Sequence, residues 1–226
     1  MQRHFDEQMQ ELRQKLVLMG RLAESMTQLA LRILIERNER LSVEIMQKEY
    51  EVDELQIEID DRAVKLTALQ QPVGSDVRFL FMASRIATEL EHIGDQAVSI
   101  CQNAHHILNA PPLKPLVDLP QMGEISEGMV RKSIEALVER DCEMARAVLE
   151  EEKEVDLFHD QIFRALLSYM MADPGTIERA LALILMSRNL ERIGDHATNI
   201  AEEVIYLVEG REVRHGNENK ARRDVG

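Results

Sequence analysis

Two stretches of the sequence carry the same arrangement of acidic side chains. Residues 90–100 read LEHIGDQAVSI and residues 190–200 read LERIGDHATNI, so each places a Glu four positions before an Asp. A further pair with the same spacing precedes each stretch. Carboxylate oxygens are hard ligands for multivalent cations, and side chains four apart are neighbours on a helix, so the pattern predicts metal binding. The eight candidate ligands are Glu49, Asp53, Glu91, Asp95, Glu152, Asp156, Glu191 and Asp195.

A metal ion would relieve a cost that these pairs impose. Like charges at this spacing repel by a few tenths of a kcal/mol on a helix, and a multivalent cation reverses the sign of that interaction. The chain has 41 acidic residues, so a single pair of this kind is most simply a solvated helix face. Four pairs at matching places favour metal binding. Helical periodicity places Glu191 and Asp195 opposite the apolar stripe of their helix, so we expect them to point outward.

Each repeated phrase also keeps a glycine inside the expected helix. Gly94 and Gly194 each cost about 1 kcal/mol relative to Ala in a helix interior. A glycine at both places indicates close approach of another helix or of a bound ion cluster, and helix packing is the simpler cause.

Other potential ligands lack this repetition. Glu89 and His92 form one ExxH motif, a spacing that di-iron carboxylate bundles use twice. The second half has Asn189 and Arg192 at the matching positions, which disfavours a ferritin-type site.

Two further histidines have no histidine counterpart in the other half. His196 is a candidate auxiliary ligand, although Gln96 matches it in the first half. His159 falls near the apolar stripe of its helix and is expected to be a satisfied core histidine. No nucleophile elbow, phosphate-binding loop or HExxH motif is present, so we predict that the chain is not an enzyme.

Composition restricts the class of protein. The 226 residues are 45% hydrophobic, 30% charged and only 4% aromatic, which is typical of a helical globular protein. The net charge of −14 argues against a nucleic-acid partner. Two distant cysteines, no signal-peptide-like N-terminus and no apolar run long enough for a bilayer lead us to expect a cytoplasmic protein without direct membrane insertion.

Proline and glycine divide the chain into two similar halves. The segment 109–120 holds four prolines and is expected to be a linker between a first bundle, 1–108, and a second bundle, 121–209. We expect 210–226 to be a disordered tail. The predicted fold is all-α, a tandem duplication of a three-helix bundle with six long helices. The expected helices are 5–37, 39–69, 75–108, 121–140, 142–171 and 176–209.

Turn residues mark the softer boundaries. Asn38 and Asp141 precede the second helix of each half and are predicted N-caps. KEYEVDEL at 48–55 aligns with EEKEVDLF at 151–158, which extends the repeat beyond the helix that carries the first phrase.

The phrases LEHIGD at 90–95 and LERIGDHATNIAE at 190–202 resemble the PhoU family of phosphate-uptake regulators, and the resemblance extends over residues 1–209. It implies two tandem three-helix bundles in a cytoplasmic, usually dimeric regulator. Such a protein restrains phosphate uptake through the phosphate ABC transporter, with its ATPase subunit, and the phosphate-sensor histidine kinase.

The resemblance also implies metal clusters at the eight acidic positions, with iron, zinc, manganese or magnesium as candidate ions. The two copies differ next to these acids: the first has Gln96, Val98 and Ser99 where the second has His196, Thr198 and Asn199. The two sites therefore need not bind metal to the same extent. The alternatives are carboxylate-bridged iron storage or a metal-dependent enzyme on a helical bundle, and a helical adaptor whose acids only solvate it.

Overall fold

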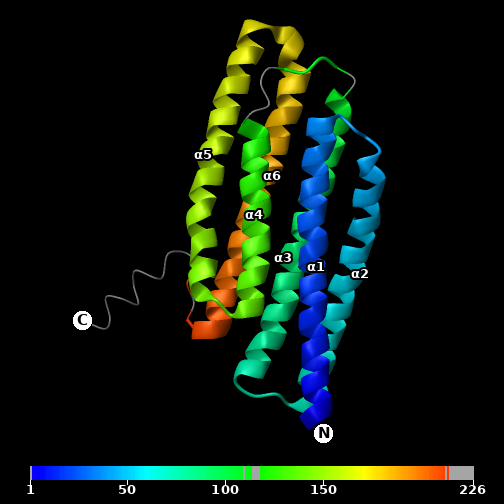
Figure 1. Cartoon of the computed structure of the whole chain (residues 1–226), viewed down its shortest axis with the longest axis vertical. Helices are drawn as coiled ribbons and strands as arrows, with labels where there is room; N and C mark the ends of the chain where they lie inside the picture. Colours follow the sequence, from blue (N-terminus) through cyan, green and yellow to red (C-terminus); the bar gives the residue numbers. More distant parts are fainter. Residues whose placement is uncertain (1, 109, 114–117, 212, 214–226) are drawn as a thin grey trace, which may run out of the picture.

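The chain forms a long helical bundle (Figure 1). The computed structural model describes residues 2–108, 110–113, 118–211 and 213. These residues contain six long helices, one short 3₁₀ turn and no strand, which confirms the predicted all-α class. The helices are α1 (Gln2–Glu36), α2 (Leu41–Gln70), α3 (Ser75–Ile107), α4 (Asp118–Glu139), α5 (Cys142–Ala172) and α6 (Ile177–Glu209), with the turn η1 (Pro174–Thr176) before α6.

The helix ends follow local chemistry. Asp141 caps α5 as predicted, because its Oδ1 accepts hydrogen bonds from the backbone N–H groups of Glu143 and Met144 at 2.8 and 3.1 Å. The prediction for Asn38 was wrong: α2 begins at Leu41, and the Asn38 side chain accepts from Arg40 N instead.

The fourth helix begins three residues before its expected start. Pro120 lies in the first turn of α4, where a missing backbone N–H breaks no intrahelical hydrogen bond. Residues 109 and 114–117 of the predicted linker, and residues 212 and 214–226 of the predicted tail, lie outside the described residues.

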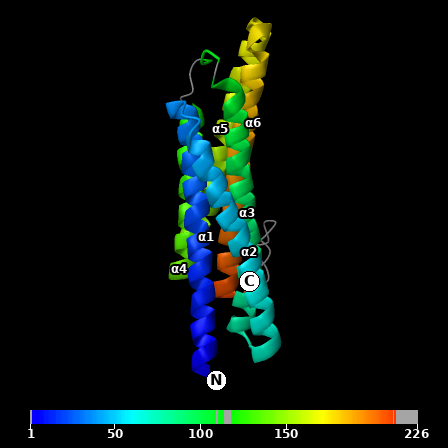
Figure 2. The same ribbon diagram turned by 90° about the vertical axis from the view of Figure 1, so that its right-hand side faces the viewer.

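Helices α1–α3 pack into one bundle and α4–α6 into another. The two bundles meet along α3 against α6 and along α1 against α4, as Figures 1 and 2 show from perpendicular directions. One continuous apolar core runs through both bundles, and α3 and α6 contribute fully buried side chains such as Ile93 and Ile193. None of the described helices combines the length and apolar character needed to cross a bilayer.

The contact between α1 and α4 repeats itself with the partners exchanged. A Cβ on Gly20 of α1 would lie 2.6 Å from Ile134 Cγ1 of α4. A Cβ on Gly123 of α4 would lie 2.3 Å from Leu31 Cδ2 of α1. Each helix therefore offers one glycine socket and one branched side chain to the other, and only glycine leaves room for these side chains. The two glycines align in the repeat, as do Leu31 and Ile134.

Candidate metal centres

The eight predicted ligands gather into two groups, one in each bundle. The first quartet consists of Glu49 and Asp53 on α2 with Glu91 and Asp95 on α3. Burial raises the pKa of Glu49, and the nearby charges of Asp53, Asp95 and Glu91 raise it further. Burial and Asp95 likewise raise the pKa values of Asp53 and Glu91. Two helices therefore bring four mutually repelling carboxyl groups together.

The second quartet has the same construction between α5 and α6. It consists of Glu152, Asp156, Glu191 and Asp195. Burial raises the pKa of Glu152, followed by the charges of Asp195 and Asp156. Burial also leads the rise in the pKa values of Asp156 and Asp195, with Glu191 the largest charge contribution to each.

The two glutamates of the repeated phrases are less exposed than helical periodicity predicted, whereas Asp95 is exposed. The side chains of Glu91 and Glu191 are only 23% and 16% exposed, so the expectation that Glu191 points freely outward was wrong. The reason is that α3 and α6 pack against other helices on more than one side. The face opposite the apolar stripe of α6 is partly covered by α5, and that of α3 by α2.

The glycines of the repeated phrases set how closely these helices approach. A Cβ on Gly94 would lie 3.3 Å from Met26 Cε and 3.7 Å from Val52 Cγ1. Val52 directly precedes Asp53, so the same packing that uses Gly94 brings α2 and its carboxylates toward α3. Gly194 has the corresponding neighbours in the second bundle, Met129 and Val155. Close helix packing, the simpler of the two expected causes, explains both glycines.

Two basic side chains, an arginine and a histidine, contact the second quartet. Arg188 Nη1 lies 2.6 Å from both carboxylate oxygens of Glu191. His159 Nε2 lies 3.6 Å from Glu191 Oε2, while its Nδ1 lies 3.0 Å from Ser187 Oγ. His159 is thus a partnered, half-buried histidine, as expected, that also faces the candidate centre.

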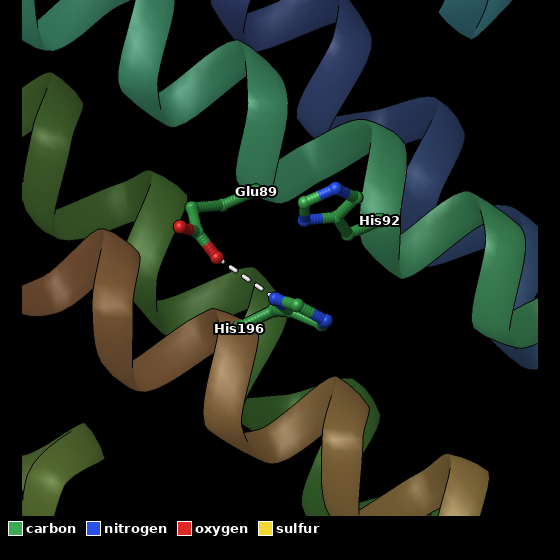
Figure 3. Close-up of side chains that lie close together, drawn as sticks. All are labelled: Glu89, His92 and His196. Atoms are coloured by element: carbon green, nitrogen blue, oxygen red, sulfur yellow. Dashed lines mark hydrogen bonds and ion pairs between the residues drawn. The ribbon is translucent and has the colours of Figure 1, made fainter.

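A third group lies where the two bundles meet. Glu89 and His92 project from α3 and His196 projects from α6 into the space between the helices (Figure 3). His196 Nδ1 is 2.8 Å from Glu89 Oε2, and the rings of His92 and His196 have centroids 5.1 Å apart. We call these three residues the junction triad.

The junction triad is more compact than either quartet. Each of its residues offers one ligand atom, and these atoms lie within 4.8 Å of one another, a condition that no other group of three His, Cys, Asp or Glu side chains among the described residues meets. The carboxylates of the quartets are therefore close neighbours without already converging on a single point. Sequence reasoning set Glu89 and His92 aside because their motif occurs once, and only the packing of α3 on α6 adds His196.

Comparison with known proteins finds the same duplication. The PhoU domain model matches the chain twice, over residues 16–104 and 119–204. The chain belongs to the PhoU family. This result confirms the resemblance drawn from the two repeated phrases.

The relatives agree in sequence and in fold. The chain is 38% identical over 209 residues to the phosphate-specific transport system accessory protein PhoU homolog of Zymomonas mobilis, covering 92% of this chain and 88% of that protein. It is similar to the crystal structure of PhoU from Pseudomonas aeruginosa, with a TM-score of 0.89 and 33% identity over 92% of this chain and 100% of that one. The PhoU structure from Streptococcus pneumoniae, at 24% identity and a TM-score of 0.85 over 92% and 99% of the two chains, shares the fold.

Membership of the PhoU family also bears on catalysis. The curated relatives found are named accessory proteins of a phosphate-specific transport system, which confirms the prediction that the chain is not an enzyme.

Proposed function

We propose that the chain is a non-enzymatic regulator of phosphate uptake and of phosphate-starvation signalling, and that metal ions on the two quartets are part of its working form. The observation that carries this proposal is the duplicated quartet within a PhoU fold. The curated relatives are named accessory proteins of a phosphate-specific transport system, which supports the regulatory role.

The donor set of each quartet fits hard cations. Four carboxylates from two helices offer only oxygen ligands, and raised pKa values at Glu49, Asp53, Glu152 and Asp156 reflect burial and mutual repulsion. A bound cation would turn this repulsion into attraction. Iron, manganese and magnesium suit such oxygen ligands best, and zinc also accepts carboxylate ligands.

Metal ions on the quartets would change how the protein meets its partners. The chain carries a net charge of −14, and each quartet adds up to four negative charges at one place. Cations would make these places neutral or positive and so permit contact with a partner surface that the bare carboxylates repel. The proposed partners are the ATPase subunit of the phosphate ABC transporter and the phosphate-sensor histidine kinase, met in the cytoplasm.

A row of apolar side chains on α2 supports a proposed homodimer. Val43, Tyr50, Ile57 and Val64 follow one another at intervals of seven residues and are each more than 60% exposed. A period of seven keeps one face of a helix against a partner helix over its whole length. We therefore propose that two copies associate along α2. Ile57→Glu should convert the dimer to a monomer in light scattering, whereas Leu69→Glu, at an exposed apolar side chain of α2 outside this row, should not.

The regulatory role is tested in cells. Alkaline phosphatase activity is measured in phosphate-replete medium in a strain that lacks the gene and carries a plasmid copy. The intact chain should restore repression. A chain with both Glu91→Gln and Glu191→Gln should not restore it, at equal protein level. If deletion leaves the activity unchanged, the regulatory role is wrong. If the double variant represses fully, the metal requirement is wrong but the regulatory role stands.

A further inference from the structure

The junction triad differs from the quartets in chemistry and in place. The quartets offer oxygen ligands only, and each lies within one bundle. The triad offers two imidazoles and one carboxylate, and it links α3 of the first bundle to α6 of the second. We propose that Glu89, His92 and His196 form a separate site for one divalent transition-metal ion of the Zn²⁺ class, which ties the two bundles together.

The geometry requires little rearrangement for this ion. Ligands around a tetrahedral zinc ion with bonds of about 2.0–2.1 Å lie roughly 3.3 Å from each other. The ligand atoms of the triad already lie within 4.8 Å of one another. Glu89 and His92 are three residues apart on α3, which places both side chains on one face of that helix. Small side-chain rotations therefore suffice to close the triad around an ion, with solvent as the remaining ligand.

The surroundings hold the carboxylate in place. Asn199 Nδ2 donates a hydrogen bond to Glu89 Oε2 at 3.0 Å, so the carboxylate has a neutral partner on α6 in addition to His196. Such outer partners orient metal ligands and commonly change metal affinity by about 10- to 100-fold. The side chains of Glu89 and His196 are 23% and 19% exposed and that of His92 is 45% exposed, which leaves an approach from solvent on the His92 side.

The two-histidine, one-carboxylate set selects among metals. Imidazole nitrogen suits zinc, copper, nickel and iron better than it suits magnesium or calcium, which prefer oxygen. The junction triad would therefore keep Zn²⁺ under conditions in which the quartets hold harder cations.

The site can occur only once in this duplicated chain. The positions that align with Glu89, His92 and His196 carry Asn189, Arg192 and Gln96. An arginine and two amides do not bind Zn²⁺. The duplication thus supplies a natural control: Gln96 shows that glutamine is accepted at the position that His196 occupies in the second half.

Zn²⁺ titration of the purified full chain, stripped with chelator, tests the proposal by calorimetry and by the side-chain ¹⁵N resonances of its histidines. Zn²⁺ should shift the resonances of His92 and His196. His196→Gln should weaken one binding event by about 10-fold or more. His159→Gln is the matched control, because it removes a half-buried histidine that lies beside the second quartet, and it should leave that event intact.

The outcomes separate this site from the quartets. Unshifted His92 and His196 resonances would overturn the proposal, as would equal Zn²⁺ affinity in the His196→Gln and His159→Gln variants. The triad would then be a hydrogen-bonded histidine–carboxylate pair that joins α3 to α6 without binding metal. Glu91→Gln with Asp95→Asn removes ligands of the first quartet, whose Glu91 Oε2 lies 3.6 Å from His92 Nε2, and it should keep the histidine shifts because the triad binds Zn²⁺ by itself. Loss of the shifts in that variant, with helical content unchanged, would also contradict an independent site.

Discussion

The two quartets have the same carboxylates but different neighbours. In the second quartet, Arg188 contacts both oxygens of Glu191, so one cation is already present. In the first half, Thr88 occupies the matching position, and its hydroxyl donates to the carbonyl of Ser84 at 3.1 Å. The basic side chain beside Glu91 is instead a histidine, with His92 Nε2 3.6 Å from Glu91 Oε2. Duplication copied the carboxylates, and the side chains around them diverged, so the two proposed metal centres should differ in affinity.

Removal of two ligands from either quartet should have the largest effect. We expect Glu91→Gln with Asp95→Asn to weaken metal binding at the first quartet on the order of 100-fold or more, because both carboxylates on α3 lose their charge. Glu191→Gln with Asp195→Asn should do the same at the second. Metal content after desalting measures the loss, and circular dichroism checks that the helices remain. Unchanged metal content in both variants would remove the quartets as metal sites.

Exchanging the residue types at positions 88 and 188 should strengthen metal binding at the second quartet and weaken it at the first. Arg188→Thr frees Glu191 from a competing cation and should strengthen binding at the second quartet by about 10-fold, the effect of roughly 1.4 kcal/mol of relieved competition. Thr88→Arg should weaken the first quartet. Calorimetric titration with Mn²⁺ compares the two variants with the parent chain. If neither substitution changes affinity, the two centres are equivalent and the comparison fails.

Replacing two carboxylates of a quartet by amides should show how much their repulsion destabilises the fold when no metal is bound. With chelator present, Asp53→Asn with Glu91→Gln should raise the free energy of unfolding by about 1 kcal/mol near neutral pH. These two groups have raised pKa values when folded, so their ionised forms destabilise the fold as pH rises through those values.

The gain should therefore shrink as pH falls below the raised pKa values, when the parent carboxyls become protonated. Asp156→Asn with Asp195→Asn should give a smaller gain, because Arg188, which has no basic counterpart in the first half, already offsets part of the repulsion there. Urea unfolding at several pH values measures both. A gain that grows toward low pH would contradict the assigned direction.

Alanine substitutions at Gly94 and Gly194 should show the smallest difference between the two halves, in the free energy of unfolding. A Cβ at Gly194 would meet its neighbours at 3.6 Å, an ordinary contact distance, so Gly194→Ala should stabilise the chain by about 0.5–1 kcal/mol through helix propensity. Gly94→Ala should gain less, because its Cβ would lie 3.3 Å from Met26 Cε. Thermal unfolding ranks the two. Clear destabilisation by Gly194→Ala would mean that the second bundle tolerates less change than its distances indicate.

The helices and the pair of acids on each helix could be predicted from the sequence because both depend on short-range spacing, whereas the joining of two pairs into a quartet depends on how α2 packs on α3 and α5 on α6. Four residues of separation fix a shared helix face, and proline and glycine fix the turns. The burial of Glu191 could not be predicted this way, since the periodicity of one helix does not show how many neighbours cover it. The junction triad was missed for a similar reason: His196 lies more than one hundred positions after Glu89 and His92 and meets them only when α3 packs against α6.

The glycine sockets of α1 and α4 were also overlooked, although a signal was available. Gly20 and Gly123 occupy the same position of the repeat, but their role depends on the exchange of Leu31 and Ile134 between the two helices. A sequence repeat does not reveal that its two copies face each other.

This exchange is the hallmark of an isologous interface, in which one surface recognises its own copy through a two-fold axis. Gly20 and Leu31 both lie on α1, so a single first bundle would carry both a socket and the side chain that fills one. The duplicated chain behaves, at this contact, like a homodimer whose subunits have been fused. Covalent connection replaces association at an effective concentration set by the linker, so the pairing of the two halves does not depend on how much protein the cell makes.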